Sequence, residues 1–267
     1  MAGYVCTIAG GKGGVGKTTT AVNVAAAMEA NGYDTVVVDA DLGMANLGEM
    51  LGIDHDRSIH EILAGDATVT DALTDVQGGV TTIAGEQSLE AFADADPAKL
   101  RKVIKTLRVA YDVVLVDTGA GLSHETTVPL GLADGILLVT TPDDVAVADT
   151  VKTAQLAERV DGTIIGGLVC RVTHDTDVEG IADDFEFPLL GVIPADSDAT
   201  ASEPLVFNAA DSVAADAYRQ LAAVLQDIFF EDVPPSDADL VVDEEWFVDD
   251  EEDVEEESSG GRFGFFG

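Results

Sequence analysis

Short apolar runs and longer amphipathic stretches alternate along most of this chain. The short runs are rich in β-branched residues, and the stretches between them are long enough for helices. The runs predict seven strands: Tyr4–Ala9, Thr35–Asp39, Val80–Ala84, Asp112–Asp117, Gly135–Thr140, Thr163–Cys170 and Leu189–Ile193. The stretches predict four helices: Thr18–Asn31, Pro97–Ala110, Val145–Val160 and Ser212–Phe229. This alternation is typical of a doubly wound α/β fold, in which helices cover both faces of a mainly parallel sheet.

The alternation ends at Pro234-Pro235, where the composition changes. Residues 231–267 contain 15 acidic residues and one arginine. Such a segment has too little apolar surface to offset the entropy lost on ordering. We therefore expect one folded domain, residues 1–230, followed by a disordered acidic tail. Two hydrophobic islands interrupt that tail, at Trp246–Val248 and at Phe263–Phe266.

The charge of the whole chain is strongly negative, with 51 acidic and 13 basic residues among 267 and a net charge of −38. A hydrophobic content of 46% still supports a core, which excludes a wholly disordered acidic protein. The acidic folded part resembles proteins of salt-in halophiles and predicts a haloarchaeal source, because concentrated salt screens the repulsion between carboxylates. A chain without a broad basic face is not expected to bind DNA.

Other function classes are also excluded by composition. Cys6 and Cys170 are too few and too far apart for a cysteine-ligated zinc or iron–sulfur site within one chain. No apolar run approaches the roughly 20 residues that a membrane span needs. The N-terminus lacks the basic region of a secretion signal, so we expect a cytoplasmic protein.

A glycine-rich loop follows the first predicted strand, and Gly11–Thr18 fits the phosphate-loop pattern G-x-x-x-x-G-K-[ST]. Glycines let backbone N–H groups surround phosphate oxygens without Cβ clashes, and the helix that follows directs its positive end at the same anion. In this pattern Lys17 reaches the β- and γ-phosphates, and the Thr18 hydroxyl ligates Mg²⁺. The residues expected to bind nucleotide phosphates are Gly11, Lys12, Gly13, Gly14, Val15, Gly16, Lys17, Thr18 and Thr19.

A second lysine inside the loop, Lys12, makes the pattern more specific. The chain has six lysines, and one lysine is enough for the local phosphate contacts. The run Lys12–Thr19 resembles the deviant Walker A loop of the MinD/ParA family of ATPases, and the chain fits the MinD branch best. The resemblance implies that ATP and Mg²⁺ are the cofactors. It also implies that Lys12 contacts the ATP of a second subunit and acts in catalysis together with Lys17.

Two further stretches resemble the switch loops of that family. Val36–Leu47 is similar to its second strand and switch I, and this implies that Asp41 orients the attacking water while Asp39 lies near the metal shell. Val113–Gly121 is similar to its Walker B strand and switch II, and this implies that Asp117 holds Mg²⁺ through water. Four apolar residues before an aspartate also place a carboxylate at the carboxyl end of a buried strand, where doubly wound folds bind ligands.

The expected base contacts come from the end of the predicted sheet. Gly191–Asp196 is similar to the family's late strand and loop over the nucleotide base, which implies contacts from Pro194 and Asp196. The family often has an adenine-reading Asn where Cys170 stands here. Arg171 follows it and is the residue that we expect at the base on this side.

The resemblance covers residues 3–230 and implies an ATPase that acts as a dimerising switch. Such a protein positions a cellular machine, and slow, partner-regulated hydrolysis of ATP to ADP and phosphate drives its release. Its expected partners are a second copy of the chain and an unidentified protein that docks on the switch loops or the tail. The aromatic end at Phe263–Phe266 would attach only weakly to a membrane. The expected locations of the cytoplasmic protein therefore include a peripheral one at the membrane or the cell poles.

Two other functions remain open from the sequence. One is a ParA-like ATPase that partitions DNA or other cargo, and the other is a metabolic phosphate-loop ligase that forms amides. A ligase would have no need for Lys12, and no substrate-binding insertion is evident.

Overall fold

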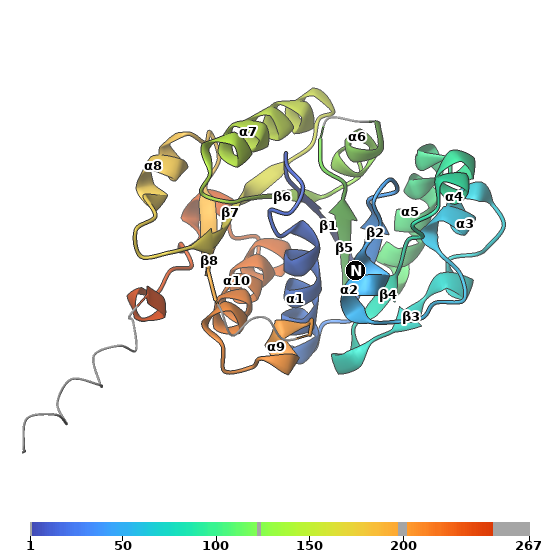
Figure 1. Cartoon of the computed structure of the whole chain (residues 1–267), viewed down its shortest axis with the longest axis horizontal. Coiled ribbons are helices and arrows are strands. Elements are labelled where there is room, and N and C mark those ends of the chain that lie inside the picture. Colours follow the sequence, from blue (N-terminus) through green and yellow to red (C-terminus); the bar gives the residue numbers. More distant parts are fainter. Residues whose placement is uncertain (1, 122–123, 197–201, 248–267) are drawn as a thin grey trace, which may run out of the picture.

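The computed structural model describes residues 2–121, 124–196 and 202–247. Within them, one sheet has the strand order β3-β4-β2-β5-β1-β6-β7-β8, and its pairs are parallel except for the antiparallel pair β3 and β4. The strands are β1 (Tyr4–Ala9), β2 (Thr35–Ala40), β3 (Thr74–Asp75), β4 (Thr81–Ile83), β5 (Val113–Thr118), β6 (Gly135–Thr140), β7 (Ile164–Val172) and β8 (Leu189–Pro194). This arrangement confirms the fold class predicted from the sequence (Figure 1).

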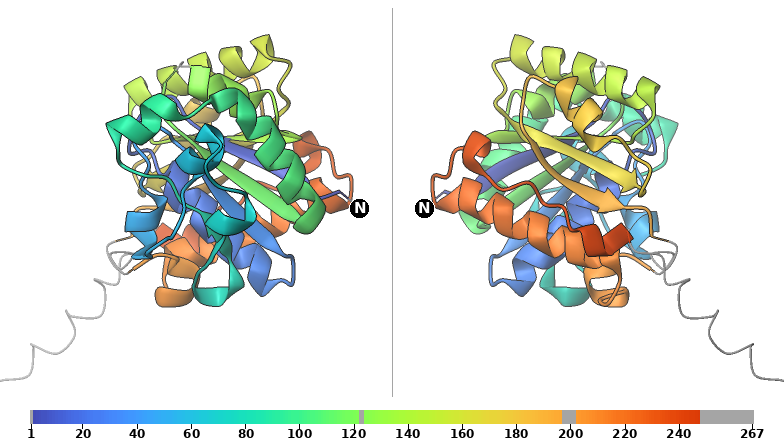
Figure 2. Two further views of the ribbon diagram at one scale, coloured as in Figure 1. Left: turned by 90° about the vertical axis from the view of Figure 1, so that its right-hand side faces the viewer. Right: turned by 90° about the vertical axis from the view of Figure 1, so that its left-hand side faces the viewer.

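Helices cover both faces of the sheet (Figure 2). They are α1 (Lys17–Ala30), α2 (Leu47–Leu51), α3 (Ile59–Ala64), α4 (Leu89–Asp94), α5 (Leu100–Ala110), α6 (His124–Leu130), α7 (Asp144–Arg159), α8 (Val178–Asp183), α9 (Leu205–Asn208) and α10 (Val213–Phe230). Alternate residues of one strand enter different cores, as a pleated strand requires. On β1, Cys6 and Ile8 pack in the core that contains α1 and α10, whereas Val5 packs in the core that contains α3 and α5.

The seven predicted strands are present, and their bounds differ from the prediction by at most two residues. The prediction missed β3 and the helices of seven residues or fewer, which are α2, α3, α4, α6, α8 and α9. Helices this short depend on caps and tertiary contacts rather than on an amphipathic repeat. No helix in the described ranges is long and apolar enough to span a membrane.

The segment 231–247, expected to begin a disordered tail, packs against the edge of the sheet in the structure. Two backbone hydrogen bonds of 2.9 and 3.0 Å join Val241 to β8, and Val241 is 5% exposed. The Trp246 indole Nε1 donates to Asp216 on α10 at 3.2 Å. The outer edge of β8 offers unpaired backbone groups, and Val241, Trp246 and Phe247 supply buried area that their acidic neighbours lack. Residues 248–267, including Val248 and Phe263–Phe266, lie outside the described residues.

Candidate active site

The glycine-rich loop leaves the carboxyl end of β1 and enters α1 at Lys17. Gly16 precedes the helix with φ +105°, a left-handed conformation that residues with a side chain disfavour. A Cβ on Gly11 would lie 2.2 Å from the backbone of Asp149 on α7, so only glycine lets the loop pass there. α1 has no side-chain cap and no acidic residue in its first turn. Its first N–H groups and its positive end therefore face the loop without compensation, which suits an anion.

A cavity of about 610 Å³ lies over this loop. Its lining includes two cations, Lys17 and Arg171, and one carboxylate, Asp41. Further lining residues come from the loop and α1 (Gly13, Gly14, Gly16, Thr18 and Thr19), from the segment after β2 (Gly43, Met44, Asn46 and Met50), and from Gln87, Ser88, Leu89, Phe92 and Ala120. In a chain with 13 basic and 51 acidic residues, two cations at one cavity favour an anionic ligand.

Lys17 lies deep in this cavity and is 7% exposed. Burial lowers the pKa of its ammonium group, although the carboxylates of Asp117 and Asp41 act in the opposite direction. Its Nζ donates to the backbone oxygen of Lys12 at 3.4 Å, a long hydrogen bond. The ammonium group is therefore placed to exchange this contact for a phosphate oxygen.

Thr18 and Asp117 meet at the floor of the site. The Thr18 hydroxyl donates to Asp117 Oδ2 at 2.6 Å, and the same hydroxyl lies 3.1 Å from Asn46 Oδ1. Asp117 is fully buried, and its Oδ1 has no hydrogen-bond partner in the described structure. Burial, together with the neighbouring carboxylate of Asp39, raises the pKa of Asp117 to about 8.

A hydroxyl beside a buried carboxylate with an unpaired oxygen fits a divalent cation. Among the described residues, no group of three or more His, Cys, Asp or Glu side chains could hold a metal ion by itself. Magnesium commonly takes one or two protein oxygens and completes its shell with water and substrate phosphates. Thr18 and Asp117 match that donor set.

Asp39 is not part of the cavity lining. It is fully buried beside Asp117, its register partner on β5. Its carboxylate accepts the backbone N–H groups of Asp41 at 3.2 Å, Asn46 at 3.1 Å and Leu47 at 3.1 Å. Burial raises the pKa of Asp39 to about 6, and these N–H groups oppose the shift. Asp39 thus shapes the backbone of residues 41–47, the switch I loop.

Asp41 itself faces the cavity. Its Oδ1 accepts the backbone N–H of Met44 at 3.0 Å. A Cβ on Gly119 would lie 2.9 Å from the same oxygen, so the loop after β5 approaches Asp41 closely. The side chain therefore lies where the two loops meet, on the same cavity as Lys17, and a carboxylate there can orient a water molecule.

Lys12 lies at the surface rather than in the cavity lining. Its Nζ is 2.9 Å from Asp143 Oδ1, and the two side chains are 44% and 47% exposed. The hydroxyl of Thr141, followed by the ammonium group of Lys12, lowers the pKa of Asp143 to about 2. Exposed ion pairs stabilise a fold weakly, so this pair can be exchanged for another partner at little cost.

The expected base contacts are only partly brought together. Arg171 lines the cavity and has φ +62°. Pro194 is buried at the end of β8, and Asp196 accepts the backbone N–H of Ala214 at 3.2 Å. Neither residue lines the cavity, and residues 197–201, which follow, lie outside the described residues.

Val15, predicted with the phosphate loop, is buried in the core beneath that loop.

Comparisons with known proteins agree with this geometry. A family model described as an AAA domain matches residues 3–164. An uncharacterized ATP-binding protein of Methanocaldococcus jannaschii is 36% identical over 82% of this chain and 86% of its own length. The septum site-determining protein MinD of Synechocystis is 31% identical over 85% of this chain and 92% of its own length. The MinD structure from Pyrococcus horikoshii, complexed with Mg-ADP, has 32% identity and a TM-score of 0.79, covering 86% of this chain and 98% of that one.

The chain belongs to the MinD/ParA-type family of P-loop ATPases. This confirms the family that the run Lys12–Thr19 predicted. The relatives come from sources that give no support to a haloarchaeal origin, which stays a prediction from charge alone.

One wall of this P-loop ATPase site was not predicted from the sequence. It consists of the segment 85–92, which contributes Gln87, Ser88, Leu89 and Phe92 to the cavity. Ser88 accepts the N–H of Ala91 and caps α4. A serine before a short apolar run is an N-cap signal, and it could have indicated the helix, although not its position at the cavity.

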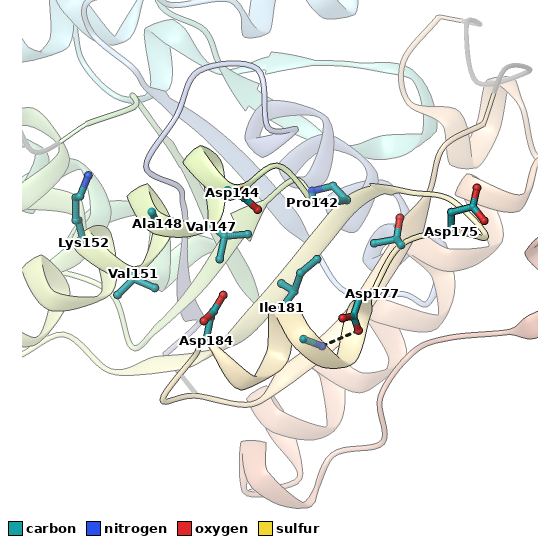
Figure 3. A pocket seen from close by; sticks show the side chains of 12 residues that line it. Pro142, Asp144, Val147, Ala148, Val151, Lys152, Asp175, Asp177, Ile181 and Asp184 are labelled. Carbon is teal, nitrogen blue, oxygen red and sulfur yellow. Dashed lines mark hydrogen bonds between the residues drawn. The ribbon is translucent and has the colours of Figure 1, made fainter.

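A larger cavity of about 930 Å³ lies between α7 and α8 and shares no lining residue with the cavity over the P-loop (Figure 3). Val147, Val151 and Ile181 form apolar parts of its lining, and Lys152 is the base among the described lining residues. Asp177 is engaged as the cap of α8, where it accepts the N–H of Gly180 at 2.9 Å (Figure 3). This lining has neither a glycine-rich loop nor a buried cation, so the cavity at the P-loop remains the candidate active site of this family member.

Proposed function

We propose that this chain is a dimerising switch ATPase that positions a cellular machine. One observation carries the proposal: Lys17, Thr18 and the unpaired Oδ1 of Asp117 converge at the uncapped start of α1. Phosphates and a divalent cation are the ligands that such a donor set fits. The name of the Synechocystis relative, a septum site-determining protein, supports the positioning role. The Mg-ADP complex of the Pyrococcus protein supports ATP and Mg²⁺ as cofactors.

The residues of the site then have separate tasks. The loop N–H groups and Lys17 bind the phosphates and balance their charge. Thr18 and Asp117 would hold Mg²⁺, which when bound neutralises charge on the β- and γ-phosphate oxygens. Asp41 orients the attacking water, and little covalent chemistry is left for the protein because positioning and charge stabilisation carry the reaction.

Dimerisation would use Lys12. Its ammonium group is at the surface, and its contact with Asp143 is between two half-exposed side chains. A second copy of the chain that presents ATP phosphates would offer Lys12 a stronger partner, because charge-assisted bonds to phosphate strengthen as water is excluded. ATP would then join two protomers, and hydrolysis would separate them.

Partner binding is proposed at the switch loops, whose conformation would depend on the nucleotide. The Trp246 island is packed against α10 and is not free for docking, so a tail contact would rest on residues 248–267. Membrane attachment through that tail would be weak, and we propose a cytoplasmic protein with at most peripheral attachment. DNA partitioning has less support because of the net charge of −38. A ligase function has less support because it gives Lys12 no task.

The proposal is tested by ATP binding and hydrolysis, measured with Mg²⁺ at low and at molar salt. Lys17→Ala is expected to lose ATP binding. Asp41→Ala is expected to keep binding and to lower turnover by about 10²-fold, as for other positioned proton or water contacts. Lys105→Ala, an exposed lysine on α5 that does not line the cavity, is the matched control and should behave like wild type. A wild-type rate for Asp41→Ala, or ATP binding by Lys17→Ala at wild-type affinity, would contradict the assigned roles.

A further inference from the structure

A buried histidine, His60 on α3, contacts two of the segments that line the cavity. It is 1% exposed and does not line the cavity itself. Its Nε2 is 2.9 Å from the backbone oxygen of Leu42, in the switch I loop. Its Nδ1 accepts the backbone N–H of Glu86 at 3.1 Å, in the unpredicted segment 85–92. The imidazole therefore bridges the switch I loop and the segment 85–92.

These contacts require a single neutral tautomer. A ring nitrogen that accepts a hydrogen bond carries no hydrogen, so Nδ1 is unprotonated and the hydrogen is on Nε2. Nε2 then donates to the oxygen of Leu42. The start of α3 holds the ring in place, because the Ser58 hydroxyl donates to Glu86 at 2.8 Å and the Ile59 N–H donates to the oxygen of Ala84 at 2.8 Å.

The other contacts between the two segments point to one continuous wall. The Gln87 amide donates to the oxygen of Ala45 at 3.0 Å and to Glu49 at 3.0 Å. A Cβ on Gly85 would lie 2.5 Å from the Ala45 methyl group, so the two backbones pass each other closely. The switch I loop is thus held against residues 85–87 over several positions, and the contact of His60 is the one nearest to Asp41 along the chain.

Asp41 is held from both sides by buried side chains. Its own N–H donates to Asp39 at 3.2 Å, and the carbonyl of the next residue, Leu42, accepts from His60. These two anchors limit rotation of the backbone that carries the Asp41 carboxylate. Loss of either anchor should let the carboxylate sample more orientations.

We infer that His60 is a positioning residue for ATP hydrolysis: by holding the Leu42 carbonyl, it fixes the orientation of Asp41 toward the attacking water. The inference rests on the proposed ATPase function. His60 acts through Asp41 and contributes nothing to the phosphate contacts of Lys17 or the loop. Its removal should therefore lower kcat and leave the binding of ATP nearly unchanged.

Three substitutions separate the two hydrogen bonds. His60→Asn keeps an acceptor where Nδ1 lies but has no donor that reaches Leu42. His60→Gln is longer and can present an amide N–H to Leu42, and His60→Leu makes neither bond. His174→Asn is the control, because His174 is exposed on the loop after β7.

Steady-state kinetics with MgATP should divide these variants. His60→Asn and His60→Leu are expected to lower kcat about three- to tenfold, the size expected from one lost hydrogen bond. KM should stay within about twofold of wild type because the phosphate loop is untouched. His60→Gln should recover most of the lost rate, and His174→Asn should match wild type. Equal losses in all three His60 variants, following their melting temperatures, would mean a purely structural role and would overturn the inference.

A measurement without nucleotide tests the same contact independently. The ¹⁵N spectrum of the imidazole should show the proton on Nε2, and the Glu86 amide should exchange slowly with solvent in wild type and rapidly in His60→Leu. A proton on Nδ1, or a wild-type kcat for His60→Asn, would overturn the inference. Absence of hydrolysis by wild type with the Nε2 tautomer intact would instead overturn the proposed function.

Discussion

Replacement of Asp39 separates the shaping of the switch I loop from nucleotide binding. The Asp39 carboxylate accepts three backbone N–H groups of that loop, and only the hydrogen bond from Leu47 is fully buried. In Asp39→Asn, the amide oxygen can still accept from Asn46 and Leu47, and the NH₂ group then faces the N–H of Asp41. In Asp39→Ala, all three donors lose their acceptor.

The magnitudes follow from these counts. A hydrogen bond to a charged group contributes about 1.5–3 kcal/mol, and an unpaired buried donor costs about 1–3 kcal/mol. Asp39→Asn loses one such bond but also removes the cost of burying the charge of Asp39, so the net loss of unfolding free energy should be about 1–2 kcal/mol. Asp39→Ala should cost about 3–5 kcal/mol, with the full penalty at Leu47 and smaller ones at the two partly buried donors.

The assay is urea denaturation. Unfolding is monitored by circular dichroism and by the fluorescence of Trp246, the one tryptophan of the chain. The slope with denaturant should be unchanged if both variants keep the native compactness. Asp56→Asn, an exposed carboxylate, is the control and should stay within about 0.5 kcal/mol of wild type. A loss below about 1 kcal/mol for Asp39→Ala, or equal losses for both variants, would refute the role given to the three hydrogen bonds.

Three further predictions concern the metal ligand, the C-terminal segment and the loop. The pKa of Asp117, raised to about 8, means that its carboxyl stabilises the ligand-free fold below pH about 4 and loses this contribution as the pH rises toward 8. MgATP binding at pH 7 should then release up to about one proton. Asp117→Asn should abolish this proton release, and calorimetry of the binding in two buffers measures it. Trp246→Leu removes the hydrogen bond to Asp216 and should lower the free energy of unfolding, measured in urea, by about 1–3 kcal/mol. ATP turnover should be unchanged, and an unchanged urea midpoint would contradict the packing. At Gly16, φ is +105° and a Cβ would lie 3.3 Å from Cys170 Sγ, so Gly16→Ala strains the loop. A titration should show ATP binding weakened about tenfold or more, and wild-type affinity would contradict this reasoning.

The central strands could be predicted from the sequence because both of their faces are buried and their apolar runs are nearly continuous. The P-loop could also be predicted, since its glycine spacing serves a backbone geometry that few other sequences provide. The role of Asp39 could not, because spacing along the chain does not show which N–H groups a buried carboxylate meets. The same holds for His60, whose two partners are 18 and 26 residues away in the sequence.

The C-terminal segment shows a different reason for failure. Composition alone marked residues 231–247 as too acidic to order. In the structure, Val241 pairs with β8 and Trp246 packs against α10, because β8 already presents an ordered edge to which a short segment can bind. Average composition hides such a contact, since it rests on a few apolar residues within an acidic segment.

The most direct test of the proposed switch is sedimentation velocity with ATP and with ADP, in the presence of Mg²⁺. The Asp41→Ala background slows turnover during the run, and Lys12→Ala is added to it in a second sample. The switch predicts dimers with ATP, monomers with ADP, and monomers under both conditions once Lys12 is replaced, with ATP binding retained. Dimers of the Lys12→Ala protein with ATP, or the same mass of the Asp41→Ala protein with both nucleotides, would contradict it.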